Sequence, residues 1–137
     1  MSHHPVKRIT APDGSRPGID VMLVPLMKAL WKAGYGTIGS CQDLGESLEG
    51  YPRQRAHWSG YVLLEMWPED ACRLLDTVKF SPQFKDRMHW ADPGAWEVSL
   101  PVMAFGLRGD DAEVGSWVQV HFPSDQIDDL VKVLTDR

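Results

Sequence analysis

Hydrophobic residues recur with a helical period in three segments of the chain. Between residues 19 and 34 they fall at positions i, i+3, i+4, i+7, i+8 and i+11, which predicts an amphipathic helix. Asp20 stands where it can cap this helix, and Pro25 predicts either a kink or a start as late as Val24. Two further stripes predict helices after Pro68 and from Ser124 onward: Ala71, Leu74, Leu75 and Val78, and Ile127, Leu130, Val131 and Leu134.

Shorter apolar or alternating segments predict four strands. They cover residues 35–41, 60–67, 95–105 and 116–122. Pro101 lies inside the third segment and predicts an edge strand or a broken one, because proline cannot donate a backbone hydrogen bond. Residues 107–115 are polar and glycine-containing, so we expect them to form a turn.

The predicted order of elements is α-β-β-α-β-β-α. It indicates an α+β fold in which about four antiparallel or mixed strands form a sheet and three helices pack mainly on one of its faces. Residues 11–18 contain two Pro and two Gly, so we expect residues 1–18 to form a flexible N-terminal arm. Residues 19–137 then form a single α+β domain.

Composition narrows the classes of function. The chain has 14 Lys and Arg against 19 Asp and Glu, a net charge of −5, which argues against extended nucleic-acid binding. With 43% hydrophobic and 24% charged residues, it is not a disordered chain. The sequence contains neither a secretory signal nor an apolar stretch of the ~18 residues that a membrane span needs. We therefore expect a cytoplasmic protein with reduced thiols, no membrane contact and no cofactor.

A basic hexad of the pattern [KR]-x-R-x-H-W occurs twice, each time ahead of a predicted strand. Its cationic, titratable and aromatic residues are Arg53, Arg55, His57 and Trp58 in the first copy, and Lys85, Arg87, His89 and Trp90 in the second. Each copy combines two fixed cations, an imidazole and an aromatic plane, which predicts a site for an anionic or nucleotide-like small molecule or an acidic partner segment. Alternatively, both hexads are solvated loops whose tryptophans anchor in the core.

A second candidate site follows the first predicted helix. It comprises Thr37, Ser40, Cys41, Gln42 and Asp43. A hydroxyl, a thiol, an amide and a carboxylate at the end of a short strand supply donors and acceptors for a ligand, and Ser40 and Gln42 are the candidate binding residues here.

The same segment supplies candidates for catalysis. Cys41 could act as a nucleophile if a histidine or arginine lowers its pKa, and His57 could act as a base that Asp43 or Glu46 orients. The alternative for Cys41 is a small buried residue, as we also expect for Cys72. No two of the cysteines and histidines show the short spacing of a zinc finger, so we expect no metal site.

The last predicted strand offers an aromatic surface. If Val118, Val120 and Phe122 face the helices, alternate residues lie on the opposite face of the sheet: Trp117, Gln119 and His121. Such a face binds a ligand, pairs with a second copy or is covered by another segment of the chain. Of the other tryptophans, we expect Trp31 and Trp67 in the core.

Two stretches resemble a known family. The sequences IDVMLVPLMKALWKAGYGTIGSCQDLGE and GYVLLEMWPEDACRLLD are similar to those of small actinobacterial and actinophage proteins, a family that brings no activity to transfer. Residues 37–41 are also similar, more weakly, to a Thr-x-Ser-Ser-Cys-Ser-Gly segment of the tRNA wybutosine-synthesising protein 3 group. That similarity implies a methyl-donor and tRNA site, but Gln42 and Asp43 depart from the pattern and the pI of 5.4 argues against a tRNA substrate.

Three hypotheses follow. The first is a small binding module, phage-related as the resemblance implies, in which the two hexads and the segment ending in Asp43 hold an anionic ligand or an acidic partner. The second is an enzyme that uses Cys41 or His57 in the chemical step. The third is a homodimeric structural or interaction protein that associates through the aromatic face of its sheet.

Overall fold

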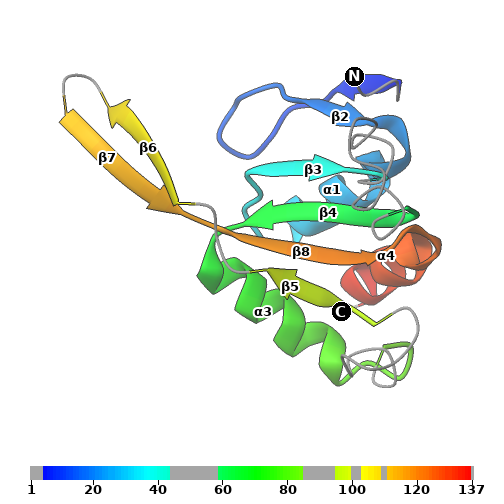
Figure 1. The fold of residues 1–137 in the computed structure, drawn as a ribbon. Helices are drawn as coiled ribbons and strands as arrows, with labels where there is room; N and C mark the ends of the chain where they lie inside the picture. Colours follow the sequence, from blue (N-terminus) through cyan, green and yellow to red (C-terminus); the bar gives the residue numbers. More distant parts are fainter. Residues whose placement is uncertain (1–4, 44–58, 85–94, 100–102, 109–110, 137) are drawn as a thin grey trace.

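The computed structural model describes residues 5–43, 59–84, 95–99, 103–108 and 111–136. Three α-helices pack against a four-stranded antiparallel sheet, which confirms the predicted α+β class (Figure 1). The helices are α1 (Val24–Lys32), α3 (Pro68–Lys79) and α4 (Ile127–Thr135).

The central sheet has the strand order β3-β4-β8-β5, with every neighbouring pair antiparallel. Its strands are β3 (Gly39–Cys41), β4 (Tyr61–Met66), β8 (Val118–Pro123) and β5 (Glu97–Ser99). The strands predicted at residues 60–67 and 116–122 are confirmed as β4 and β8. The strand predicted at residues 35–41 is shorter than expected, since β3 begins at Gly39, and β5 is an edge strand as Pro101 indicated.

The first helix begins late, as Pro25 allowed. A 3-10 turn, η1 (Val21–Leu23), precedes α1, and Pro25 occupies the first turn of α1, where its missing N–H costs no helical hydrogen bond. Gly34, with φ +91°, lies just beyond the helix. The prediction that the Asp20 side chain caps this helix is wrong, because its carboxylate instead accepts the backbone N–H of Gln42 at 2.9 Å.

The hydrophobic core lies between the helices and one face of the sheet. On that face Val62, Leu64 and Met66 of β4 are fully buried, and so are two residues of β8, Val120 and Phe122. Next to β5, the ring of Trp96 stacks on Phe122 with centroids 4.7 Å apart and meets the edge of Phe84. Trp96 and most residues of the three predicted stripes therefore supply the core. Met22, which the first stripe included, is exposed because it lies in the 3-10 turn before α1.

Two residues expected in the core are on the surface. Trp67 is 46% exposed because it follows the last residue of β4 and starts α3 through the bond between its carbonyl and the N–H of Ala71. Cys72 is exposed because it lies outside the stripe that α3 buries. Trp31, in contrast, is partly buried and packs against the core, as expected.

Two hairpins were not predicted. The first pairs β1 (Val6–Arg8) with β2 (Gly18–Asp20), and the neighbouring Ile9 is buried in the core. The division into an arm at residues 1–18 and a domain at residues 19–137 stays a prediction.

The second hairpin pairs β6 (Met103–Arg108) with β7 (Asp111–Ser116). The polar turn predicted at residues 107–115 is therefore wrong for most of its length: two strands pair there along six residues each. Figure 1 shows this hairpin standing out from the body of the molecule next to the beginning of β8. Among the described residues, no helix is long and apolar enough to cross a membrane.

Candidate functional site

The face of the sheet opposite the helices carries a row of residues that crosses all four strands. Cys41 pairs with Leu63, Leu63 with His121, and His121 with Glu97. Cross-strand partners share a face, with Cβ atoms about 4.5–5.5 Å apart, so the register aligns a thiol, an imidazole and a carboxylate along one line. His121 is 1% exposed and is not accessible to a ligand in this structure.

Next to this row, Gly39 of β3 pairs with Glu65 of β4, and Glu65 holds Trp117 in place. The predicted facing of β8 is confirmed for Val118, Val120 and Phe122, which are buried, while Trp117 is only partly covered. The Nε1–H of Trp117 donates to Oε2 of Glu65 on β4. Glu65 lies over Gly39 so closely that a Cβ added there would sit 2.8 Å from its Oε1. A glycine on β3 therefore makes room for the carboxylate that fixes the indole.

The polar residues of the 37–43 segment largely organise the segment itself. The Nε1–H of Trp31 donates to Oγ1 of Thr37 at 3.1 Å, and Gln42 accepts the N–H of Met22 at 3.3 Å. The thiol of Cys41 donates to the carbonyl oxygen of Asp43 at 3.3 Å. A nucleophilic Cys41 would lose this hydrogen bond on deprotonation, and both the binding and the catalytic role of the segment stay predictions.

Asp43 closes the segment that contains the first hexad. Its Oδ1 accepts the backbone N–H of Gly60 at 3.1 Å, which joins the residues on either side of positions 44–59. The six residues of the first hexad lie within 44–58 and those of the second within 85–94, so both hexads, with His57 and His89, lie outside the described residues.

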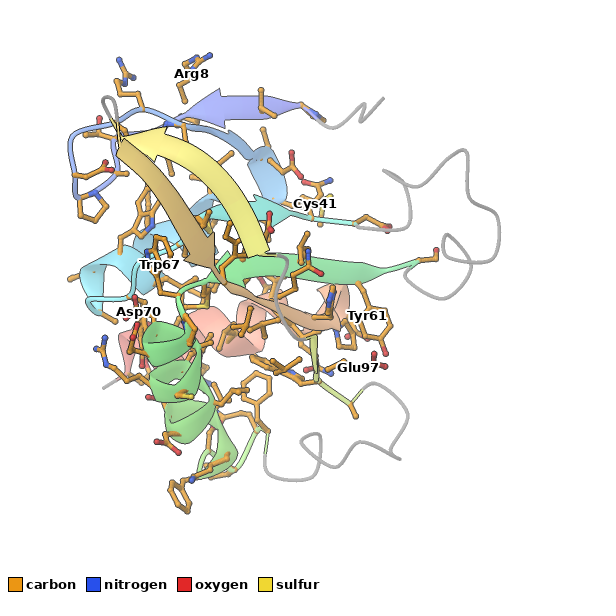
Figure 2. The ribbon with its side chains drawn as sticks, turned by 60° about the vertical axis from the view of Figure 1, so that its left-hand side comes forward. Arg8, Cys41, Tyr61, Trp67, Asp70 and Glu97 are labelled. Atoms are coloured by element: carbon orange, nitrogen blue, oxygen red, sulfur yellow. The ribbon has the colours of Figure 1, made fainter. Side chains whose placement is uncertain are left out.

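The sheet topology nevertheless relates the two candidate sites. Because β4 is antiparallel to both β3 and β8, and β8 is antiparallel to β5, the ends of β3 and β8 meet the beginnings of β4 and β5. Each hexad precedes one of these two beginnings in the sequence. Strands β4 and β5 thus start at the end of the sheet where Cys41 lies, and in Figure 2 Cys41, Tyr61 and Glu97 lie toward this same end.

Tyr61 adds a hydroxyl donor to this end of the sheet. Burial raises the pKa of Tyr61 above its usual 10.0, and the nearby carboxylates of Glu97 and Asp125 raise it further. The phenol therefore stays protonated throughout the physiological range and can donate a hydrogen bond to an anion. Sequence analysis missed Tyr61, Glu65 and Glu97. The period of a strand was the available signal. Successive side chains of residues 61–66 point to opposite faces, which places Tyr61 and Glu65 on the face opposite the buried Val62.

In the part of the chain that the structure describes, no three metal-ligating side chains come together. The resemblances noted in the sequence stay expectations without independent support. Comparison of the chain with family models, with curated proteins and with solved structures finds no match.

Proposed function

We propose that this protein is a binding module for an anionic, nucleotide-like small molecule. The proposed site is the end of the central sheet where β4 and β5 begin. The observation that supports it is topological: both strands that follow a basic hexad start at the end where Cys41, Tyr61 and Glu97 lie. Each basic hexad therefore precedes, in the sequence, a strand that begins at this end of the sheet.

The parts of a nucleotide match the residue types that these stretches supply. The phosphate would pair with the cations of the hexads, which are Arg53, Arg55, Lys85 and Arg87. Trp58 and Trp90 would stack on the base, and Tyr61 and Glu97 would donate to and accept from its polar groups. The acidic Glu97 and Asp125 beside Tyr61 would disfavour a bare polyanion. A ligand with both a charged and a ring part is therefore favoured over a strand of nucleic acid.

Thermal unfolding in the presence of mononucleotides and cyclic nucleotides tests this proposal. At a concentration of about 100 times Kd, a ligand should raise Tm by about 9 °C. The double variant Arg55→Ala with Arg87→Ala should lose this shift. Arg16→Ala with Lys28→Ala is the matched control, because it removes the same charge from two exposed positions elsewhere, and it should keep the shift. Equal shifts in both variants, or no shift of the wild type with any nucleotide, would contradict the proposal.

A second candidate function, association into a homodimer, is favoured by the register of the β6–β7 hairpin. The sequence of the two paired strands alternates, and the period of a strand predicts one uncharged and mostly apolar face from positions Met103, Phe105, Leu107, Ala112, Val114 and Ser116. The charged positions Arg108, Asp111 and Glu113 belong to the other set. A two-stranded hairpin is marginally stable alone. A second copy related by two-fold symmetry offers an identical apolar face to cover this one.

Sedimentation equilibrium tests the second candidate. A homodimer should give twice the 15.4 kDa of the chain at high protein concentration. The single change Phe105→Asp should shift the equilibrium toward the monomer, whereas Glu113→Gln on the other face should not. A mass of one chain at every concentration would rule out this function.

A further inference from the structure

A pocket of about 460 Å³ lies apart from the end of the sheet discussed above. It is bounded by the loop between β1 and β2 on one side and by α1 and the approach to β3 on the other. This volume is within the range of small-molecule sites in proteins. Its lining combines apolar and aromatic side chains with a few polar groups, which is also usual for such sites.

The loop that forms one wall is internally bonded. The N–H of Ala11 donates to the carbonyl of Ser15 at 2.8 Å, and the N–H of Gly14 donates back to Ala11 at 2.9 Å. Gly14 has φ +87°, which glycine adopts without strain. Outside the turn, the guanidinium of Arg8 donates to the carbonyl of Arg16 at 2.8 Å. The wall is therefore shaped before any ligand arrives, which lowers the entropic cost of binding.

The opposite wall is apolar and fixed. Trp31 lines the pocket, and its indole is oriented by the 3.1 Å hydrogen bond to Thr37. Met27 and Ile19, which are 1% and 5% exposed, complete this wall and belong to the hydrophobic core. A polarizable thioether beside an indole offers favourable contacts to hydrocarbon and aromatic groups.

Asp13 is the only formally charged side chain among the described residues that line the pocket. Its Oδ1 accepts the N–H of Ser15 at 2.9 Å and the hydroxyl of Ser15 at 2.6 Å. These hydrogen bonds hold the pKa of Asp13 below its usual value, so the carboxylate is ionised at neutral pH. Asp13 is exposed, so its carboxylate is accessible to a ligand.

We infer that this pocket binds a small organic cation, with its ammonium group against Asp13 and its hydrocarbon or aromatic body against the partly exposed ring of Trp31. The charge of the pocket selects for a cation, and the face of an indole attracts a cation further. The remaining polar groups of the lining, the hydroxyls of Ser15 and Ser40, can accept hydrogen bonds from an ammonium group. The inference does not depend on the proposed nucleotide site, since the ligand has the opposite charge and its carboxylate partner is Asp13; Ser40, a candidate binding residue of the 37–43 segment, lines this pocket.

Three probes of similar shape and different charge test this inference: benzylammonium, benzyl alcohol and benzoate. Ligand-observed NMR titration should show benzylammonium binding most tightly and benzoate not at all. Asp13→Asn keeps the shape and the acceptor for Ser15 but removes the charge, so it should weaken benzylammonium about five- to tenfold. Asp76→Asn, an exposed position on α3, is the matched control and should leave the affinity unchanged.

A second variant addresses the aromatic wall. Trp31→Phe retains an aromatic ring but loses the donor to Thr37 and the stronger cation–π partner, so it should weaken both benzylammonium and benzyl alcohol, and benzylammonium more, by a few-fold. Circular dichroism of each variant checks that the fold is intact. Equal affinity of wild type and Asp13→Asn for benzylammonium would overturn the inference, and so would binding of benzoate.

Discussion

Gly39 leaves room for the side chain of Glu65, whose carboxylate holds the indole of Trp117. A Cβ at position 39 would lie 2.8 Å from Oε1 of Glu65, and this carboxylate accepts the indole N–H of Trp117. Gly39→Ala should therefore shift the carboxylate end of the flexible Glu65 side chain and weaken a charge-assisted hydrogen bond, at a cost of up to about 1 kcal/mol in the free energy of unfolding. Urea denaturation measures this loss.

A double-mutant cycle gives the control for this prediction. In the Glu65→Ala background no carboxylate is left to displace, and Gly39→Ala should be neutral or slightly stabilising because alanine restricts the unfolded chain. Additive effects of the two substitutions would show that the approach of Gly39 to Glu65 has no energetic consequence.

Tyr61 should make stability depend on pH in the alkaline range. Its pKa is raised in the folded state by burial and by two carboxylates, above the 10.0 of the unfolded chain. Between the two pKa values the folded state binds more protons than the unfolded state, so stability falls as pH rises. The contribution is fully present below about pH 10 and is lost as the pH passes the folded pKa. Above about pH 10 the free energy of unfolding should fall more steeply for wild type than for Tyr61→Phe; parallel curves from urea titrations would contradict this.

At the scale of elements, the first helix begins at Val24 and not at residue 19, where the apolar stripe begins. Pro25 then lies in the first turn, and Lys28 is an exposed interior position. Pro25→Ala should change the free energy of unfolding by less than about 1 kcal/mol, whereas Lys28→Pro should cost about 3 kcal/mol or more. Equal small effects in urea denaturation would mean that residue 28 is not inside a helix.

The elements that could be predicted are those whose pattern is repeated and uninterrupted. Pro68 with the stripe of α3 identified that helix, and a short apolar run that ends before Pro68 identified β4. The β6–β7 hairpin was missed because Gly106 interrupts β6, and β7 contains two acids and Gly115, residue types that are typical of turns. The cap at Asp20 was misjudged because Gln42, 22 residues away, competes for the same carboxylate. Local sequence does not contain such long-range partners.

At the scale of the molecule, sequence analysis identified candidate residues but could not predict which of them come together. The segment around Cys41 and the two basic hexads were recognised as separate patterns. Only the register of β3, β4, β8 and β5 shows that the segment and the strands after both hexads share one end of the sheet. The pocket beside Asp13 could not be predicted from the sequence either. Its walls come from a turn, a helix and the residues before β3, and these come together only in the tertiary structure.

The register of the central sheet also shows that the β6–β7 hairpin is an insertion between two strands of that sheet. Ser99 of β5 pairs directly with Gln119 of β8, so these strands form a hairpin in which residues 100–118 are the connection, and β6 and β7 are inserted in it. Replacing residues 101–116 by a four-residue Gly/Asn linker should leave the body folded, with a free energy of unfolding equal to or about 1 kcal/mol above that of wild type, because the connection is shorter. Far-UV circular dichroism and urea denaturation measure this. If the shortened chain still unfolds cooperatively and sediments as a monomer where the wild type sediments as a dimer, the hairpin serves association. If the body no longer folds, the hairpin is needed for the fold itself.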